Sequence, residues 1–87
     1  MPTEPAGLDV AREIRRLIQE QAPAWQSREL ADGLALGSEG IGLDSVGIVE
    51  LLLACEKRFG VKFPLELLEQ APLTVGRLVE YVRNARN

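Results

Sequence analysis

Apolar residues recur at spacings of three and four in three stretches of this chain, and this period limits the possible folds more than any other feature. The stretches run from Leu8 to about Gln21, from Ser45 to Phe59, and onward from Thr74. Such spacing places side chains on one face of an α-helix, whereas a half-buried strand alternates every second residue. No stretch alternates in that way. The sequence therefore predicts an all-α fold with three longer helices.

Residues typical of helix ends support these helices and add a short one. The side chains of Asp44 and Ser45 can accept hydrogen bonds from the first free amides of a helix, and Gly60 is suited to end it. Pro64 fits the first position of a helix, so Pro64–Gln70 is expected to be a short third helix. Thr74 is expected to cap the last one. The predicted architecture is a four-helix bundle.

The connection between the first two longer helices, residues 23–44, is unusually long for a compact domain. It contains one proline and four glycines, yet apolar residues are spaced between its polar ones. That apolar content favours a long first loop that packs back on the core over a free linker. Part of it, near Ser27–Ala31, is expected to form a helical turn.

A chain of 87 residues has room for one domain. Residues 1–7 hold two prolines and a glycine without an apolar pattern and are expected to be a flexible N-terminal tail, which leaves residues 8–87 as the domain. The N-terminus lacks the basic and apolar regions of a signal peptide, and no apolar run approaches the roughly 20 residues that span a bilayer. We expect a cytoplasmic protein without a membrane segment.

The chemistry that the side chains can support is narrow. The chain has no histidine and one cysteine, Cys55, which excludes Ser-His-Asp and Cys-His pairs, His-ligated zinc, cysteine clusters and an intrachain disulfide. A net charge of −3 offers no basic footprint for nucleic acid. No catalytic or metal site is expected, and Cys55 is interpreted as a small buried hydrophobe.

The most informative stretch is Gly42-Leu43-Asp44-Ser45, immediately before the apolar second helix. Taken with the residues that follow it, this stretch resembles the acyl carrier protein family from about residue 8 to residue 83. The long first loop, a phenylalanine fourteen residues after the serine and the Thr-Val that opens the last helix belong to the same pattern. The further matching residues are Val49-Glu50-Leu51, Glu56, Phe59-Gly60 and Pro64.

The resemblance implies that Ser45 is esterified by 4′-phosphopantetheine, which a separate transferase donates from coenzyme A. The thiol of this arm would then hold an acyl group as a thioester. Asp44 would help the transferase to recognise the carrier, and Leu43 would anchor the loop to the core. The position is physically suitable, because unpaired amides and the dipole at a helix N-terminus favour an anion.

Docking of partner enzymes is expected on the second helix. Val46, Val49 and Leu53 match positions where related carriers expose apolar side chains, although burial in the core is an equally good reading of each. The opposite face is the better core candidate, with Leu51, Leu52, Cys55 and Phe59 as its main members. Glu50 and Glu56 on this helix can steer the chain toward basic partners. The complete set of expected docking residues is Val46, Val49, Glu50, Leu53, Glu56, Lys57 and Arg58.

Lys57 and Arg58 depart from bacterial fatty-acid carriers, which usually have acids there, and Gly47 departs as well. These differences favour a stand-alone, monomeric carrier of a polyketide or other natural-product pathway. Its expected partners are the transferase and acyl-loading, condensing or modifying enzymes. A fatty-acid-like pathway, a peptidyl carrier and an unmodified helical interaction module remain alternatives. Peptidyl carriers often have Gly-Gly before the residue that precedes the serine, so Gly42-Leu43 favours acyl cargo.

Overall fold

The computed structural model describes residues 9–64, 66–69 and 73–86. Its elements are α1 (Val10–Gln21), the 3₁₀ turn η1 (Pro23–Trp25), α2 (Ser45–Phe59), α3 (Glu66–Glu69) and α4 (Val75–Arg86). The described part of the chain contains no strand, only an isolated bridge between Ala35 and Thr74. The all-α prediction is confirmed. The expected tail at residues 1–7, the expected start at Leu8 and the expected helix end at Gln70 lie outside the described residues.

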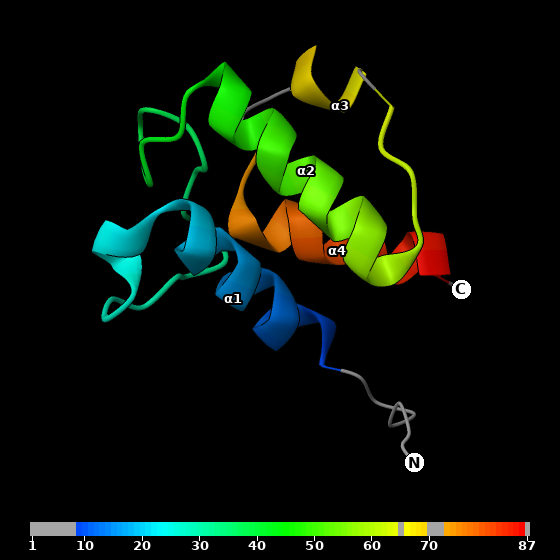
Figure 1. Ribbon diagram of the computed structural model, residues 1–87, viewed down its shortest axis with the longest axis horizontal. Coiled ribbons are helices and arrows are strands. Elements are labelled where there is room, and N and C mark those ends of the chain that lie inside the picture. Colours follow the sequence, from blue (N-terminus) through cyan, green and yellow to red (C-terminus); the bar gives the residue numbers. More distant parts are fainter. Residues whose placement is uncertain (1–8, 65, 70–72, 87) are drawn as a thin grey trace.

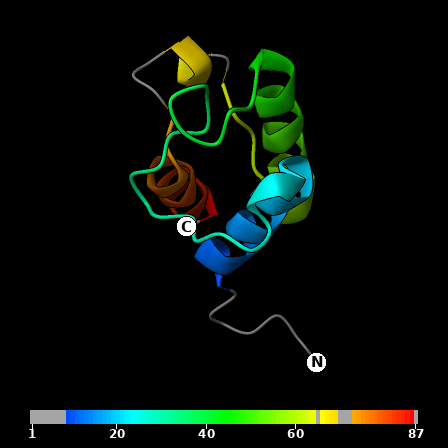
Figure 2. The ribbon, with the colours of Figure 1, turned by 90° about the vertical axis from the view of Figure 1, so that its left-hand side faces the viewer.

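Helix α1 is the element on which the two other long helices pack. Its first turn is capped by Asp9, whose carboxylate accepts a hydrogen bond from the Arg12 amide at 3.1 Å. One face buries Val10, Ile14, Leu17 and Ile18, and this face contacts both α2 and α4. Figure 2 shows α2 and α4 on opposite sides of the molecule with α1 below them.

Helix α4 has the start and the buried face that the sequence predicts. The Thr74 hydroxyl accepts a hydrogen bond from the Arg77 amide at 3.2 Å, which caps the first turn. The side chains that α4 buries recur at the spacing of three and four predicted for the stretch after Thr74, namely Val75, Leu78, Val79 and Val82. Figure 1 shows α4 beneath α2, with the last turns of both helices at the same end of the molecule.

The first loop, residues 22–44, is packed on the core as expected. Leu30, Leu36 and Ile41 are all buried. The loop also supplies hydrogen-bond acceptors to the start of α4: the amides of Val75 and Gly76 donate to the carbonyl oxygens of Leu34 and Asp32 at 3.0 and 2.8 Å. These amides lie in the first turn of α4, where no partner exists within the helix. The loop therefore joins the start of α4 to the core.

The expected helical turn near Ser27–Ala31 is wrong: the helical turn is η1, four residues earlier. Pro23 explains the shift, since its fixed φ suits the first helical position directly after α1. The end of η1 and the backbone after it accept hydrogen bonds from side chains of α1. The side chain of Arg15 donates to the Leu30 carbonyl at 2.8 Å, and that of Gln19 donates to the Trp25 carbonyl at 3.2 Å.

Candidate functional site

Ser45 is the first residue of α2 and is exposed, as is Asp44 before it. The Asp44 carboxylate accepts a hydrogen bond from the Gly47 amide at 2.7 Å, so Asp44 is the N-cap. A Cβ atom on Gly47 would lie 3.3 Å from the capping oxygen, tighter than most real contacts. Glycine at this position therefore leaves room for the cap. The predicted helix start is confirmed in its geometry.

The segment before Ser45 is held by the first loop itself. The amides of Ile41 and Leu43 donate to the carbonyl oxygens of Ala35 and Leu36 at 2.8 and 3.0 Å, and Leu43 packs against the core. Between them Gly42 has a φ of +96°, a conformation that residues with a Cβ rarely adopt. The chain therefore turns at Gly42 and delivers Asp44 and Ser45 to the surface.

Trp25 adds a longer-range contact to this segment. Its indole nitrogen donates to the Ile41 carbonyl at 3.2 Å, and the Arg28 guanidinium lies 4.1 Å from the centre of the ring system. Because Trp25 belongs to η1, directly after α1, this hydrogen bond connects the first helix with the residues that precede Ser45. No local spacing in the sequence indicated it.

The two faces of α2 differ sharply. Leu51, Leu52, Cys55 and Phe59 are buried, as predicted for the core set. Val46, Val49 and Leu53 are 64%, 38% and 54% exposed, and these are the exposed large hydrophobic residues of the described chain. Their alternative assignment to the core is wrong. Glu50 is exposed beside them, so the start of α2 presents an apolar stripe with acidic neighbours.

The last turn of α2 gives its charged residues different surroundings. The Glu56 carboxylate accepts a hydrogen bond from the Phe63 amide at 2.8 Å and is only partly exposed. The Nε atom of Arg58 donates to Glu13 of α1 at 2.7 Å. Lys57 is exposed. Glu56 and Arg58 thus have structural partners within the chain. A docking role for these two residues and for Lys57 stays a prediction.

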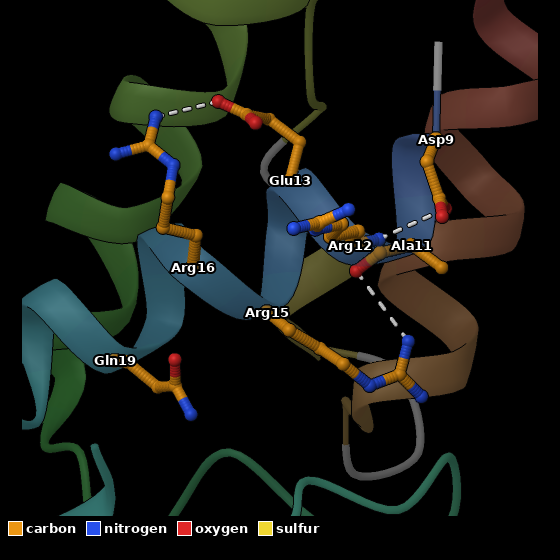
Figure 3. Close-up of a pocket in the computed structure, with 7 residues that line it drawn as sticks. All are labelled: Asp9, Ala11, Arg12, Glu13, Arg15, Arg16 and Gln19. Atoms are coloured by element: carbon orange, nitrogen blue, oxygen red, sulfur yellow. Dashed lines mark hydrogen bonds and ion pairs between the residues drawn. The ribbon is translucent and has the colours of Figure 1, made fainter. Parts of the chain in front are cut away.

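Glu13 of α1 binds two guanidinium groups, that of Arg16 on the same helix and that of Arg58 on α2. The contact with Arg58 joins the two helices. The Glu13 side chain is only 14% exposed. The hydrogen bond from Arg16 is the main cause that lowers the pKa of Glu13, and the positive charge of Arg58 acts in the same direction while burial opposes them. Figure 3 shows Glu13 and Arg16 in an open groove along α1, which Asp9, Ala11, Arg12, Arg15 and Gln19 also line.

Cys55 is completely buried, and its burial raises the pKa of the thiol to about 12. The thiolate form that would act as a nucleophile is therefore strongly disfavoured. Among residues 9–64, 66–69 and 73–86, no cluster of three or more acidic, histidine or cysteine side chains is placed to hold a metal ion. None of the described helices is both long and apolar enough to span a membrane.

Comparison with known proteins covers nearly the whole chain. The family described as Phosphopantetheine attachment site matches residues 12–82. The acyl carrier protein of Campylobacter hominis is 29% identical over 77 residues, which are 88% of this chain and 94% of that protein. Acyl carrier protein AcpP of Rhizobium meliloti is 27% identical over 78 residues, with 90% and 96% covered. A Helicobacter pylori acyl carrier protein is 41% identical over 44 residues, with 51% and 55% covered.

Proposed function

The chain belongs to the acyl carrier protein family, and we propose that Ser45 is the residue to which its 4′-phosphopantetheine group is attached. When bound, this group supplies a thiol that carries an acyl group as a thioester between enzymes. The observation that supports Ser45 is its place as the exposed first residue of α2 within the matched region. A hydroxyl there is accessible to a transferase.

The residues around Ser45 fit a phosphodiester. The first turn of α2 offers backbone amides and the positive end of the helix dipole, both of which favour an anion. Asp44 takes the Gly47 amide and so leaves the other first-turn amides to a group on Ser45. Gly47 has no Cβ atom that would crowd the capping carboxylate of Asp44 at the start of α2. Asp44 fixes the helix start, and Leu43 anchors the preceding loop.

The pathway is the finer part of the proposal. We assign residues 8–87 to one four-helix carrier domain that acts as a monomer in the cytoplasm and is not itself an enzyme. Its relatives carry the name acyl carrier protein, which favours acyl over aminoacyl cargo. Lys57, exposed at a position where fatty-acid carriers usually have an acid, favours a polyketide or related natural-product pathway. Its partners there are the transferase and the acyl-loading, condensing and modifying enzymes.

Modification is tested with coenzyme A, a broad-specificity phosphopantetheinyl transferase and intact mass spectrometry. We expect the wild-type chain to gain one phosphopantetheinyl group and Ser45→Ala to gain none. Ser38→Ala is the matched control, because Ser38 is also exposed but lies in the first loop, and it should be modified like the wild type. Modification of Ser45→Ala, or none of the wild type, would contradict the proposal and favour an unmodified interaction module.

Docking is assigned to the stripe formed by Val46, Val49 and Leu53, because exposed apolar side chains on a helix favour contact with another protein. Leu53→Asp should leave the unfolding free energy nearly unchanged, since this side chain is half exposed, but should slow acyl transfer by partner enzymes about tenfold. Ala31→Asp adds the same charge at an exposed loop position and should have little effect. Equal rates for Leu53→Asp and the wild type would exclude this surface.

A further inference from the structure

Charge is segregated along the chain around α2. From residue 29 to residue 56 the sequence has six acidic residues and no lysine or arginine, whereas residues 57–65 have three cations and no acid. At the Ser45 end of the helix the exposed charges are Glu39, Asp44 and Glu50. At the other end they are positive. The two ends of one helix therefore carry opposite charge.

The positive charges come from three segments that meet at the end of α2. The guanidinium of Arg86, in the last turn of α4, lies 5.7 Å from the centre of the Phe59 ring. The Tyr81 hydroxyl of α4 donates to the Lys62 carbonyl at 3.1 Å, which holds residue 62 beside that helix. Figure 1 shows the last turns of α2 and α4 at the same end of the molecule. We call this surface the basic end; it consists of Lys57, Arg58, Lys62 and Arg86.

Among the described residues, the acids nearest to the basic end bind Arg58 or the backbone and leave its two lysines unpaired. Glu13 is shared between Arg58 and Arg16, and the Glu56 carboxylate is bonded to the Phe63 amide. Lys57 and Lys62 are exposed, and neither forms an ion pair with another described residue. Both ammonium groups are therefore available to a partner.

We propose that the basic end is a second docking contact, one that fits an acidic patch on the enzyme that receives the Ser45 end. This inference rests on the proposed carrier function. Arg58 lies thirteen positions after Ser45, which separates the two contacts by about 20 Å along the helix axis. The partner therefore has a basic region at the mouth of its active site and an acidic region about that distance away.

Opposite charges at the two ends give α2 only one favourable direction on such a surface. In the reversed direction, like charges would face one another at both ends, which penalises the wrong orientation. The apolar stripe of Val46, Val49 and Leu53 lies between the two contacts. A second copy of the chain is a poorer occupant, because a stable dimer buries about 800 Å² per partner and one face of a 15-residue helix offers less.

The experiment uses the phosphopantetheinylated protein and the enzyme that acylates it, purified from the native source by following that transfer. The Michaelis constant for the carrier is measured with Lys57→Glu and Lys62→Glu. Lys62 lies outside the helix, so its variant avoids the unfavourable placement of an acid at a helix C-terminus. Lys57→Arg keeps the charge, and Arg12→Glu makes the same change of net charge at an exposed residue of α1.

We expect both glutamate variants to raise KM about three- to tenfold at low ionic strength with kcat unchanged, and the difference to shrink as salt is added. The two controls should behave like the wild type. Unchanged or lower KM values, or an equal rise for Arg12→Glu, would overturn the inference. A change of oligomeric state in the glutamate variants would assign the surface to a second copy instead. Failure of the carrier function is distinguishable, since Ser45 would then carry no phosphopantetheine at all.

Discussion

The first loop and helix α2 adjoin in the chain but are stabilised in opposite ways. The loop has little regular structure, and its backbone is held by turns within the loop and by contacts with other segments, as when the Leu36 amide donates to the Leu73 carbonyl at 2.9 Å. Helix α2 satisfies its own backbone and leaves one face exposed. Changes in the loop should therefore cost stability, whereas changes on the outer face of α2 should cost binding.

The largest effect is expected at Gly40 in the loop. A Cβ atom on Gly40 would lie 2.2 Å from the Ala35 carbonyl oxygen, a distance that no side chain tolerates. Since that oxygen also accepts the Ile41 amide, the turn must open, and Gly40→Ala should lower the free energy of unfolding by about 4 kcal/mol. Urea unfolding measures this.

Gly33→Ala is the matched control, because a Cβ there meets nothing within 4 Å. This variant should change stability by no more than about 0.5–1 kcal/mol, and restriction of the unfolded chain favours a gain. Equal losses for Gly33→Ala and Gly40→Ala would show that the loop is not held by the Ala35 contact.

The next largest effect is expected when one leucine of the first loop and one leucine of α2 are each replaced by alanine. Leu36 in the loop is completely buried, whereas Leu53 on α2 is 54% exposed. Leu36→Ala should cost about 3 kcal/mol through lost burial and a residual cavity, and Leu53→Ala about 0.5 kcal/mol or less. Thermal and urea unfolding test this pair. If the two variants lose the same stability, the contrast between a structural loop and an accessible helix face fails.

Local signals explain how much of this structure could be predicted. The limits of α2 at Ser45 and Phe59 follow from residues adjacent to them: Asp44 caps an amide three positions on, and Gly60 adopts a left-handed φ of +70°. The buried face follows from periodicity, because a helix repeats its faces every three to four residues. The resemblance to acyl carrier proteins singled out Ser45, and local signals placed it at the helix start, where its side chain is exposed.

Contacts between distant segments could not be predicted in this way. Arg58 lies 45 residues after Glu13, and no spacing reveals that they meet. The Glu56 bond to the Phe63 amide depends on how the chain turns after α2. Gly40 is one of several glycines in the loop, and only the position of the Ala35 carbonyl shows that a Cβ is excluded there. The loop lacks periodicity, so its tertiary contacts decide its path.

The smallest effect on stability is expected at Glu13 of α1, whose carboxylate binds Arg58 of α2. The two guanidinium groups are half exposed, so Glu13→Gln should cost about 1 kcal/mol or less at pH 7. Because hydrogen bonding from Arg16 lowers the pKa of Glu13 in the folded state, this stabilisation is present above the ordinary pKa of 4.5 and is lost as the pH falls through the lowered value. The free energies of unfolding of the wild type and Glu13→Gln, measured with urea, should therefore become equal in acid.

Glu20→Gln is the control. It removes a carboxylate that bonds Arg16 alone, so this variant should lose less stability at pH 7 than Glu13→Gln. A difference between the wild type and Glu13→Gln that stays constant with pH would mean that the charge of Glu13 does not hold α2 to α1.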